Sequence, residues 1–159
     1  MPRVVRKRRI PAPASVIWSV IADPYHLPRW WPRTRRVENV TAGGEPRGRK
    51  WTQVLETRDG RGIRADYRCV SATPNERYVF EQEVQGTPFA GFLRSVRTEI
   101  ELAPDEGETR VTMASEQRLR GLSRLGSPMM RRAIGRTLSE ALAGLERATG
   151  SGEAPGAAS

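Results

Sequence analysis

The alternation of apolar and polar residues between residues 36 and 119 constrains the fold of this chain more than any other feature. Six segments alternate with a period of two, which is typical of β-strands with one buried face. They are Arg36–Val40, Lys50–Thr57, Gly62–Ser71, Arg77–Val84, Phe92–Ala103 and Thr109–Leu119. The connections are mostly short and contain Gly, Pro, Asn or Asp, which favour turns. The pattern therefore predicts an antiparallel meander.

One further strand and two short helices are expected ahead of this meander. Val4–Ile10 is predicted to be a first strand. Its four consecutive cations, Arg6–Arg9, alternate between both faces, so some of them must pair with acids or lie at the end of the sheet. A short helix, Ala14–Ile21, follows, and Asp23–Pro24 starts a second one that reaches about Trp31. The apolar stripe of the first helix comprises Val16, Ile17, Val20 and Ile21.

The last ordered element predicted is a long amphipathic helix, Pro128–Thr149, with Ser127 as its N-cap. Its apolar face consists of Met130, Ile134, Leu138, Ala141, Leu142 and Leu145. A curved sheet of seven strands exposes one apolar face, and this helix is the only element able to cover it. The sequence thus predicts an α+β domain over residues 1–149, with residues 150–159 as a disordered tail.

Alternation within the strands also assigns side chains to the two faces of the sheet. It places Val79 on the outer face, among charged neighbours, and Cys69 on the inner face. The polar residues of the inner face are Tyr67, Tyr78, Gln82, Ser115 and Gln117. Buried polar groups need partners, so these bond to one another, to the backbone or to trapped water, or they line a cavity and orient a ligand. Both interpretations are open at this point.

The formal net charge of +9 is compatible with binding to nucleic acid or to an anionic membrane. However, only Lys7 and Lys50 of the 27 basic residues are lysines, and the arginines are spread along the chain. This indicates a compositional bias rather than phosphate recognition. No stretch approaches the roughly 20 apolar residues of a membrane span. We therefore expect a cytoplasmic protein with no specific nucleic-acid partner and no integral membrane association.

One cysteine and one histidine limit the available chemistry. Cys69 alone cannot form an internal disulfide or a Cys-rich zinc site, and neither a metal nor a cofactor is expected. His26 is the only histidine, and its place in a turn favours a capping or exposed role over a catalytic one. Tyr67 or Tyr78 could act as a catalytic acid, and Arg94 could hold an enolate. The alternatives are packing in the cavity wall for the tyrosines and a solvated strand end for the arginine.

Four segments carry motifs. Ile10–Trp18 contains an I-x-A-P…V-W pattern, and Asp23–Pro32 contains D-P…L…W-x-P. Glu99–Pro104 and Glu108–Thr112 match a penultimate strand and a G-T-R-V-T segment, with Glu108 in place of the glycine. In these segments the chain resembles the START-like, or SRPBCC, helix-grip superfamily over residues 3–149. The resemblance implies a curved seven-stranded antiparallel sheet wrapped around the long C-terminal helix, with a hydrophobic cavity between them.

Members of this superfamily bind lipids, sterols, polyketides, quinones or plant-hormone-like ligands, and some are polyketide aromatase/cyclases or dehydratases. The resemblance transfers no catalytic set, but it implies that Trp30 packs near the cavity mouth. Phe89 lies in a loop between Gly86 and Gly91, whose glycine ends would allow it to gate the cavity. The candidate cavity lining comprises Trp30, Tyr67, Tyr78, Phe80, Gln82, Phe89, Val96, Thr98, Met113, Ser115, Met130, Ile134 and Leu138.

The favoured function is binding or transport of a small hydrophobic ligand in an internal cavity. The first alternative is an enzyme of the polyketide cyclase/dehydratase type. The second is an interaction protein that uses its basic surface.

Overall fold

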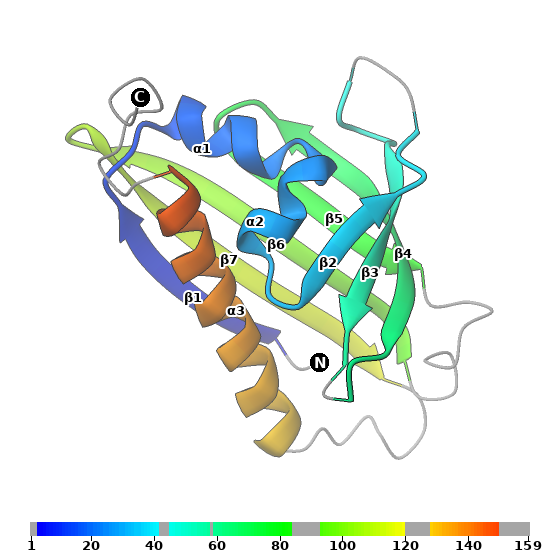
Figure 1. The fold of residues 1–159 in the computed structure, drawn as a ribbon. Helices are drawn as coiled ribbons and strands as arrows, with labels where there is room; N and C mark the ends of the chain where they lie inside the picture. Colours follow the sequence, from blue (N-terminus) through cyan, green and yellow to red (C-terminus); the bar gives the residue numbers. More distant parts are fainter. Residues whose placement is uncertain (1–2, 42–44, 58, 84–92, 120–127, 150–159) are drawn as a thin grey trace.

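The computed structural model describes residues 3–41, 45–57, 59–83, 93–119 and 128–149 (Figure 1). Within these ranges, residues 93–95, 118 and 119 are described by their backbone alone. The predicted gating loop with Phe89, the predicted N-cap Ser127 and the predicted tail 150–159 lie outside the described residues.

The order of elements confirms the predicted α+β, helix-grip class. The elements are β1 (Arg3–Ile10), α1 (Ala14–Ile21), the 3₁₀ turn η1 (Pro24–His26), α2 (Leu27–Trp30), β2 (Thr34–Glu38), β3 (Lys50–Glu56), β4 (Gly62–Thr73), β5 (Arg77–Glu83), β6 (Leu93–Asp105), β7 (Glu108–Leu119) and α3 (Pro128–Thr149). The second predicted helix is thus a 3₁₀ turn that runs directly into one turn of α-helix. Its start is capped by Asp23, whose carboxylate accepts a hydrogen bond from the Tyr25 backbone N–H at 3.0 Å.

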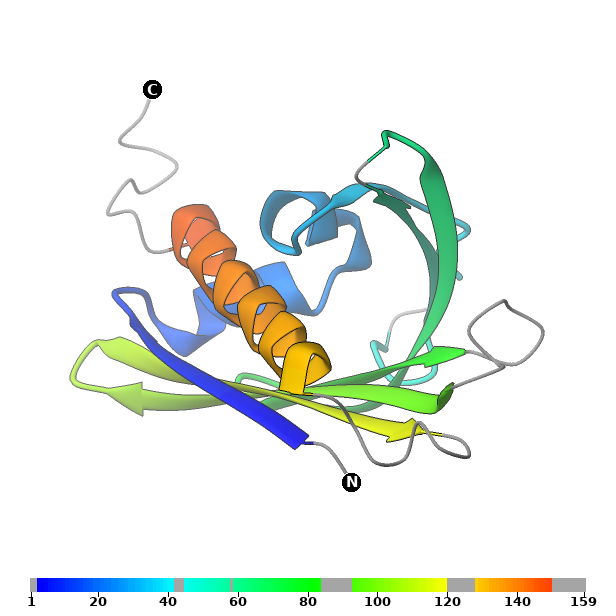
Figure 2. The ribbon, with the colours of Figure 1, turned by 90° about the horizontal axis from the view of Figure 1, so that it is seen from below.

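The strands form one antiparallel sheet in the order β1-β7-β6-β5-β4-β3-β2. Strands β2 to β7 pair as a meander, and β1 closes the edge by pairing with β7 in the register Val4 opposite Ser115. The register shifts between Cys69 and Ser71 in β4 and between Thr34 and Arg36 in β2. Such bulges bend a strand, and Figure 2 shows that β4, β3 and β2 turn away from the flatter half of the sheet and curl over its concave side.

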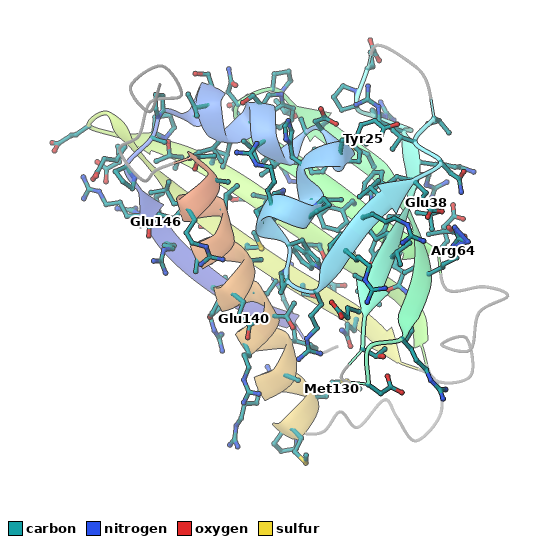
Figure 3. All side chains as sticks on the ribbon, in the orientation of Figure 1. Tyr25, Glu38, Arg64, Met130, Glu140 and Glu146 are labelled. Atoms are coloured by element: carbon teal, nitrogen blue, oxygen red, sulfur yellow. The ribbon has the colours of Figure 1, made fainter. Side chains whose placement is uncertain are left out.

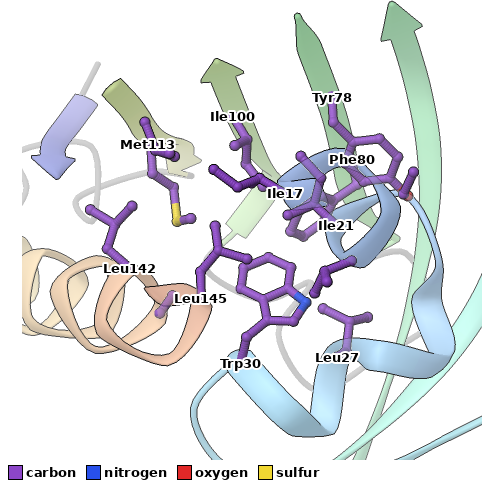
Figure 4. Packing of buried hydrophobic residues seen from close by; sticks show 14 of the residues in the cluster. Ile17, Ile21, Leu27, Trp30, Tyr78, Phe80, Ile100, Met113, Leu142 and Leu145 are labelled. Atoms are coloured by element: carbon purple, nitrogen blue, oxygen red, sulfur yellow. The ribbon is translucent and has the colours of Figure 1, made fainter. Parts of the chain in front are cut away.

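The three helices lie on this concave side (Figure 2). Helix α3 packs against β1 and β7, whereas α1 and α2 lie between α3 and the curled strands. The predicted apolar face of α3 is confirmed for Leu138, Ala141, Leu142 and Leu145, which are buried against Met113, Ile17 and their neighbours (Figure 4). Apolar burial of this kind is the main driving force for closing the sheet around the helix.

Gly144 allows the close approach of α3 to α2. A Cβ added at this position would overlap the backbone carbonyl of Trp30. Glycine therefore lets the backbones of the two helices come into contact, although it has a lower helix propensity than alanine.

One sequence prediction about a face is wrong, and another is right about the face but not about burial. Val79 lies on the outer face as predicted, but its side chain is only 1% exposed. It lies opposite Glu99 and Ser71, and Glu99 forms an ion pair with Arg77, two positions before Val79 in β5. The helical pattern predicts Val16 in the buried stripe of α1, but this residue is 41% exposed. The buried residues centre on Ile17 and Ile21, and Val16 lies about 100° around the helix from Ile17.

The cations of β1 are accommodated largely as expected. Arg8 Nη2 bonds to Glu146 Oε2 of α3 at 2.7 Å, and Arg9 pairs with Glu108 and, at 3.6 Å, with Asp105. Arg8 therefore faces the helix, while Arg9 lies at the end of the sheet. These are exposed ion pairs, whose contribution to stability is small.

Candidate ligand-binding site

A continuous cluster of aromatic rings lines the concave face under α1 and α2. Phe80 lies at its centre, with ring centroids 5.7 Å from Trp31 and 5.8 Å from Tyr67. Trp51 stacks on Tyr67 at 6.0 Å, and Trp18 meets Tyr78 edge-on at 5.9 Å. These aromatic contacts join β3, β4 and β5 to both short helices, and edge-on and offset rings are the arrangements that such pairs prefer.

The register of the sheet arranges the inner-face residues in three parallel rows. The first row is Tyr78, Ile100 and Met113, and the second is Cys69, Phe80, Thr98 and Ser115. The third row is Tyr67, Gln82, Val96 and Gln117. The register thus places eight of the predicted lining residues on one continuous surface: Tyr67, Tyr78, Phe80, Gln82, Val96, Thr98, Met113 and Ser115.

Burial decreases across these rows. The side chains of the first two rows are buried, and Ile100 and Met113 have no accessible surface. In the third row only Tyr67 is buried, and Gln82, Val96 and Gln117 are partly exposed. We call Tyr67, Gln82, Val96 and Gln117 the half-covered row.

The predicted lining residues of α3 follow the same gradient. Leu138 is fully buried, whereas Ile134 and Met130, nearer the start of the helix, are partly exposed. Met130 lies at the end of α3 that is lowest in Figure 3, which is also the end at which Arg3 and Arg6 of β1 approach the helix. Because β1 pairs Arg3 with Glu116, next to Gln117 of the half-covered row, the less covered part of α3 and the less covered part of the sheet are at the same end of the molecule.

The hydroxyl and thiol groups of this surface are neutral. The Tyr78 hydroxyl bonds to the Cys69 thiol, and the thiol also contacts the backbone oxygen of Ser71 at 3.5 Å. Burial raises the pKa of Tyr67, of Tyr78 and of Cys69 above their ordinary values. All three groups therefore keep their protons at neutral pH and serve as hydrogen-bonding groups rather than as charges.

Trp30 presents an unsatisfied donor to the interior. Its side chain is only 3% exposed, and its buried indole Nε1–H has no hydrogen-bond partner among the described residues. Figure 4 shows the indole among Ile17, Ile21 and Leu145, with its nitrogen on the side of Leu27. A buried N–H without an acceptor is costly, and a ligand or a water molecule is the usual partner of such a group. Trp30 is therefore buried as part of the core, and its indole N–H has no partner among the described residues.

Sequence reasoning missed one polar network of the interior. Trp51 Nε1 donates to Gln53 Oε1 at 3.1 Å, and Gln53 Nε2 donates to Thr34 Oγ1 at 3.2 Å. All three residues are buried. Trp51 and Gln53 are two positions apart in β3, so alternation from the aromatic Trp51 would have placed both on the inner face.

The remaining candidates do not join the site. His26 lies at the end of η1, where its Nδ1 is 3.2 Å from Arg29 and its Nε2 is 3.6 Å from Asp23. It is a surface residue of the helical turn and takes no part in the aromatic cluster. Phe89 lies outside the described residues, and the side chain of Arg94 is not described.

Two pockets adjoin α3. One, of about 430 Å³, lies between α3 and the segment around α2, and its lining includes Trp30, Trp31, Arg33, Glu140 and Arg147. The other, of about 340 Å³, lies between α3 and β1. Of the predicted lining residues, only Trp30 contributes to either of these two pockets.

The described residues include no group of three His, Cys, Asp or Glu side chains that would hold a metal ion. None of their charged side chains is buried. Among the described helices, none has the length and hydropathy needed to span a membrane.

A curled antiparallel sheet that encloses a long C-terminal helix, with an aromatic and neutral interior, defines the helix-grip class of hydrophobic-ligand-binding folds. The sequence agrees with this class: the chain belongs to the polyketide cyclase / dehydrase and lipid transport family, whose model matches residues 1–150. No curated protein matches the sequence.

Solved structures share the fold at low sequence identity. TTHA0849 from Thermus thermophilus is 19% identical, with a TM-score of 0.72 over 92% of this chain and 96% of that one. A START superfamily protein from Mycobacterium smegmatis is 16% identical, with a TM-score of 0.73 over 92% of this chain and 96% of that one. BexL, a di-domain ARO/CYC from the BE-7585A biosynthetic pathway, is 21% identical, with a TM-score of 0.73 over 92% of this chain and 46% of BexL.

Proposed function

We propose that this protein binds a small, largely hydrophobic molecule at the half-covered end of its concave face, and that it carries the molecule rather than transforms it. One observation carries the proposal. Burial falls from the row of Tyr78 to the row of Gln82, and the partly exposed residues Met130 and Ile134 of α3 are at the same end. A mixed surface of apolar and neutral polar side chains, left partly uncovered at one end of a closed core, is suited to binding an amphipathic small molecule.

The polar groups near this surface indicate the chemistry of the ligand. Tyr67 and Gln82 offer neutral hydrogen-bonding groups beside the aromatic wall to which Trp51 belongs. A ligand with one or a few carbonyl or hydroxyl oxygens would accept these hydrogen bonds. None of the residues of the half-covered row is charged, so a charged group buried against them would lose its hydration without gaining an ion pair there. We therefore propose an uncharged, oxygen-bearing hydrophobic ligand.

The ionisation of the tyrosines supports binding over catalysis. A general acid works best when its pKa is near the operating pH. Burial raises the pKa of Tyr67 and of Tyr78, which moves both further from neutral pH. Both phenols are suited to donate hydrogen bonds and poorly suited to transfer a proton. A cytoplasmic location belongs to the same proposal, since the single cysteine, Cys69, is buried and needs no oxidising compartment.

The test uses the neutral fluorescent probe N-phenyl-1-naphthylamine, which the basic surface does not attract. The wild type is expected to bind it saturably. Val96→Arg places a cation in the half-covered row and should weaken binding by at least about tenfold. Either the guanidinium loses its hydration when the probe binds, or it stays hydrated and occupies the space that the probe needs. Val16→Arg makes the same substitution at an exposed valine of α1 and should leave binding unchanged.

Two results would contradict the proposal: no saturable probe binding by the wild type, or equal affinity of the two folded variants. Turnover of a bound oligo-β-ketone by the wild type would instead make the enzyme alternative correct.

A further inference from the structure

The pocket between β1 and the start of α3 is lined mainly by arginines. Its lining residues are Arg3, Val4, Val5, Arg6, Arg131 and Arg132. Its volume is about 340 Å³, and no acidic residue of the described chain lines it. We call it the arginine pocket. It shares no lining residue with the half-covered row, although both are at the same end of the molecule, and nothing in the proposed function requires it.

A glycine of α3 gives Arg6 its position. Arg6 lies opposite the buried Met113, on the side of β1 that faces α3, and its guanidinium rests against Gly135. A Cβ at position 135 would overlap that guanidinium. Arg131 and Arg132 precede Gly135 by four and three residues, so they share this region of the helix surface. The cations of two elements thus meet in one pocket because the helix has no side chain where Arg6 crosses it.

The positive charge of the pocket is not balanced by the described part of the chain. Arg3 is 3.7 Å from Glu116, at the edge of the pocket. No ion pair joins Arg6, Arg131 or Arg132 to a described carboxylate, in contrast to Arg8 and Arg9 of the same strand. Like charges that line one pocket repel one another. An anion with several oxygens would remove the repulsion and occupy the guanidinium donors.

We propose that the arginine pocket binds a phosphate monoester dianion. Each guanidinium presents a planar fork of N–H donors that matches two oxygens of a phosphate. A tetrahedral phosphate can face donors arriving from β1 and from α3 at once, whereas a planar carboxylate presents only two oxygens. The phosphate belongs either to a soluble metabolite or to a lipid headgroup, which offer the same chemistry to the pocket.

The experiment is a calorimetric titration of the full chain with inorganic phosphate at pH 7.5, where the dianion predominates, at constant ionic strength set with sodium chloride. We expect saturable binding of one phosphate. Arg131→Gln with Arg132→Gln should weaken it by at least about tenfold, because each charge-assisted hydrogen bond lost is a strong one. Arg61→Gln with Arg68→Gln removes the same charge from exposed positions on β4 and its preceding turn, and should leave the affinity unchanged.

Gly135→Ala provides a test that changes no charge. The added methyl group should displace the Arg6 guanidinium, which is the end of a flexible side chain, and so weaken phosphate binding while the helix remains folded. The neutral probe of the half-covered row should bind this variant as it binds the wild type, so failure of this proposal is distinguishable from failure of the proposed function.

The outcomes separate clearly. Phosphate binding that is not saturable, equal loss in the two double variants, or unchanged affinity in Gly135→Ala would overturn the proposal. If the wild type binds soluble glycerol 3-phosphate as well as it binds phosphatidylcholine vesicles containing phosphatidic acid, the source is a metabolite. If it binds phosphatidic acid vesicles far more tightly, and the Arg131/Arg132 variant does not, the source is a lipid headgroup.

Discussion

Removing the hydroxyl of Tyr67 or of Tyr78 should affect stability differently, although both rings are in one aromatic cluster. The Tyr78 hydroxyl bonds to Cys69, whereas no hydrogen bond joins the Tyr67 hydroxyl to another described residue. Tyr78→Phe should therefore lower the free energy of unfolding by about 0.5–1.5 kcal/mol, the net worth of one hydrogen bond. Tyr67→Phe removes a hydroxyl that no described residue bonds, so it should leave that free energy unchanged or raise it by up to about 1 kcal/mol.

The measurement is urea unfolding followed by tryptophan fluorescence, with the slope of the transition checked for each variant. A difference of about 1–2 kcal/mol between the variants corresponds to roughly 2–8 °C in Tm for a domain of this size. In the presence of an oxygen-bearing hydrophobic ligand the Tyr67 variant should lose affinity by about 2–12-fold, because one hydrogen bond to the ligand is missing. Equal destabilisation by both substitutions, at an unchanged slope, would refute the reasoning.

Three further predictions concern the whole domain. Stability should fall as the pH rises above about 10, because the raised pKa of Tyr67 and of Tyr78 keeps both phenols protonated in the folded state while the unfolded chain releases those protons. The free energy of unfolding can be measured by urea unfolding at several pH values. Its slope against pH should decrease by up to about 1.4 kcal/mol per pH unit for each tyrosine replaced by Phe. Gly144→Ala should destabilise the protein by about 1–3 kcal/mol because the added methyl group meets the Trp30 carbonyl. Gly135→Ala should be neutral or stabilising by up to about 1 kcal/mol. Thermal unfolding should therefore show shifts in Tm that are opposite or clearly unequal for the two variants. Binding to duplex DNA, measured by fluorescence anisotropy, should be weak, independent of sequence and steeply reduced by salt, and tight binding to one sequence at physiological salt would contradict this expectation.

The elements of the fold were predictable because its patterns are local. The period of two in β3 to β7 and the apolar face of α3 located these elements to within two residues. Alternation also placed the inner-face residues from Tyr67 to Ser115 on one surface, since a strand with one buried face has only two ways to orient its side chains. The exposure of Val16 and the burial of Val79 on its predicted outer face have a common cause: periodicity identifies a face, but burial depends on which neighbouring side chains cover it.

The candidate site was less predictable because it depends on contacts between distant parts of the chain. The missing partner of the Trp30 indole, the network from Trp51 to Thr34 and the gradient of burial along the sheet all arise from the tertiary arrangement. The pockets on both sides of α3 arise in the same way. The sequence supplied the residues of the inner face, but it could not show at which end of the sheet they are left partly uncovered.

The two buried glycines of α3 illustrate how a departure from a local rule can be interpreted. Each lowers helix propensity by about 1 kcal/mol relative to alanine, so each needs a compensating interaction. Gly144 is compensated by the close packing of α2, which buries Trp30 and completes the core. Gly135 instead adjoins the guanidinium of Arg6, in a region where Arg131 and Arg132 already add positive charge. No ion pair joins Arg6, Arg131 or Arg132 to a described carboxylate. On the proposal above, an anion bound in the arginine pocket supplies the charge and the hydrogen-bond acceptors that compensate for Gly135.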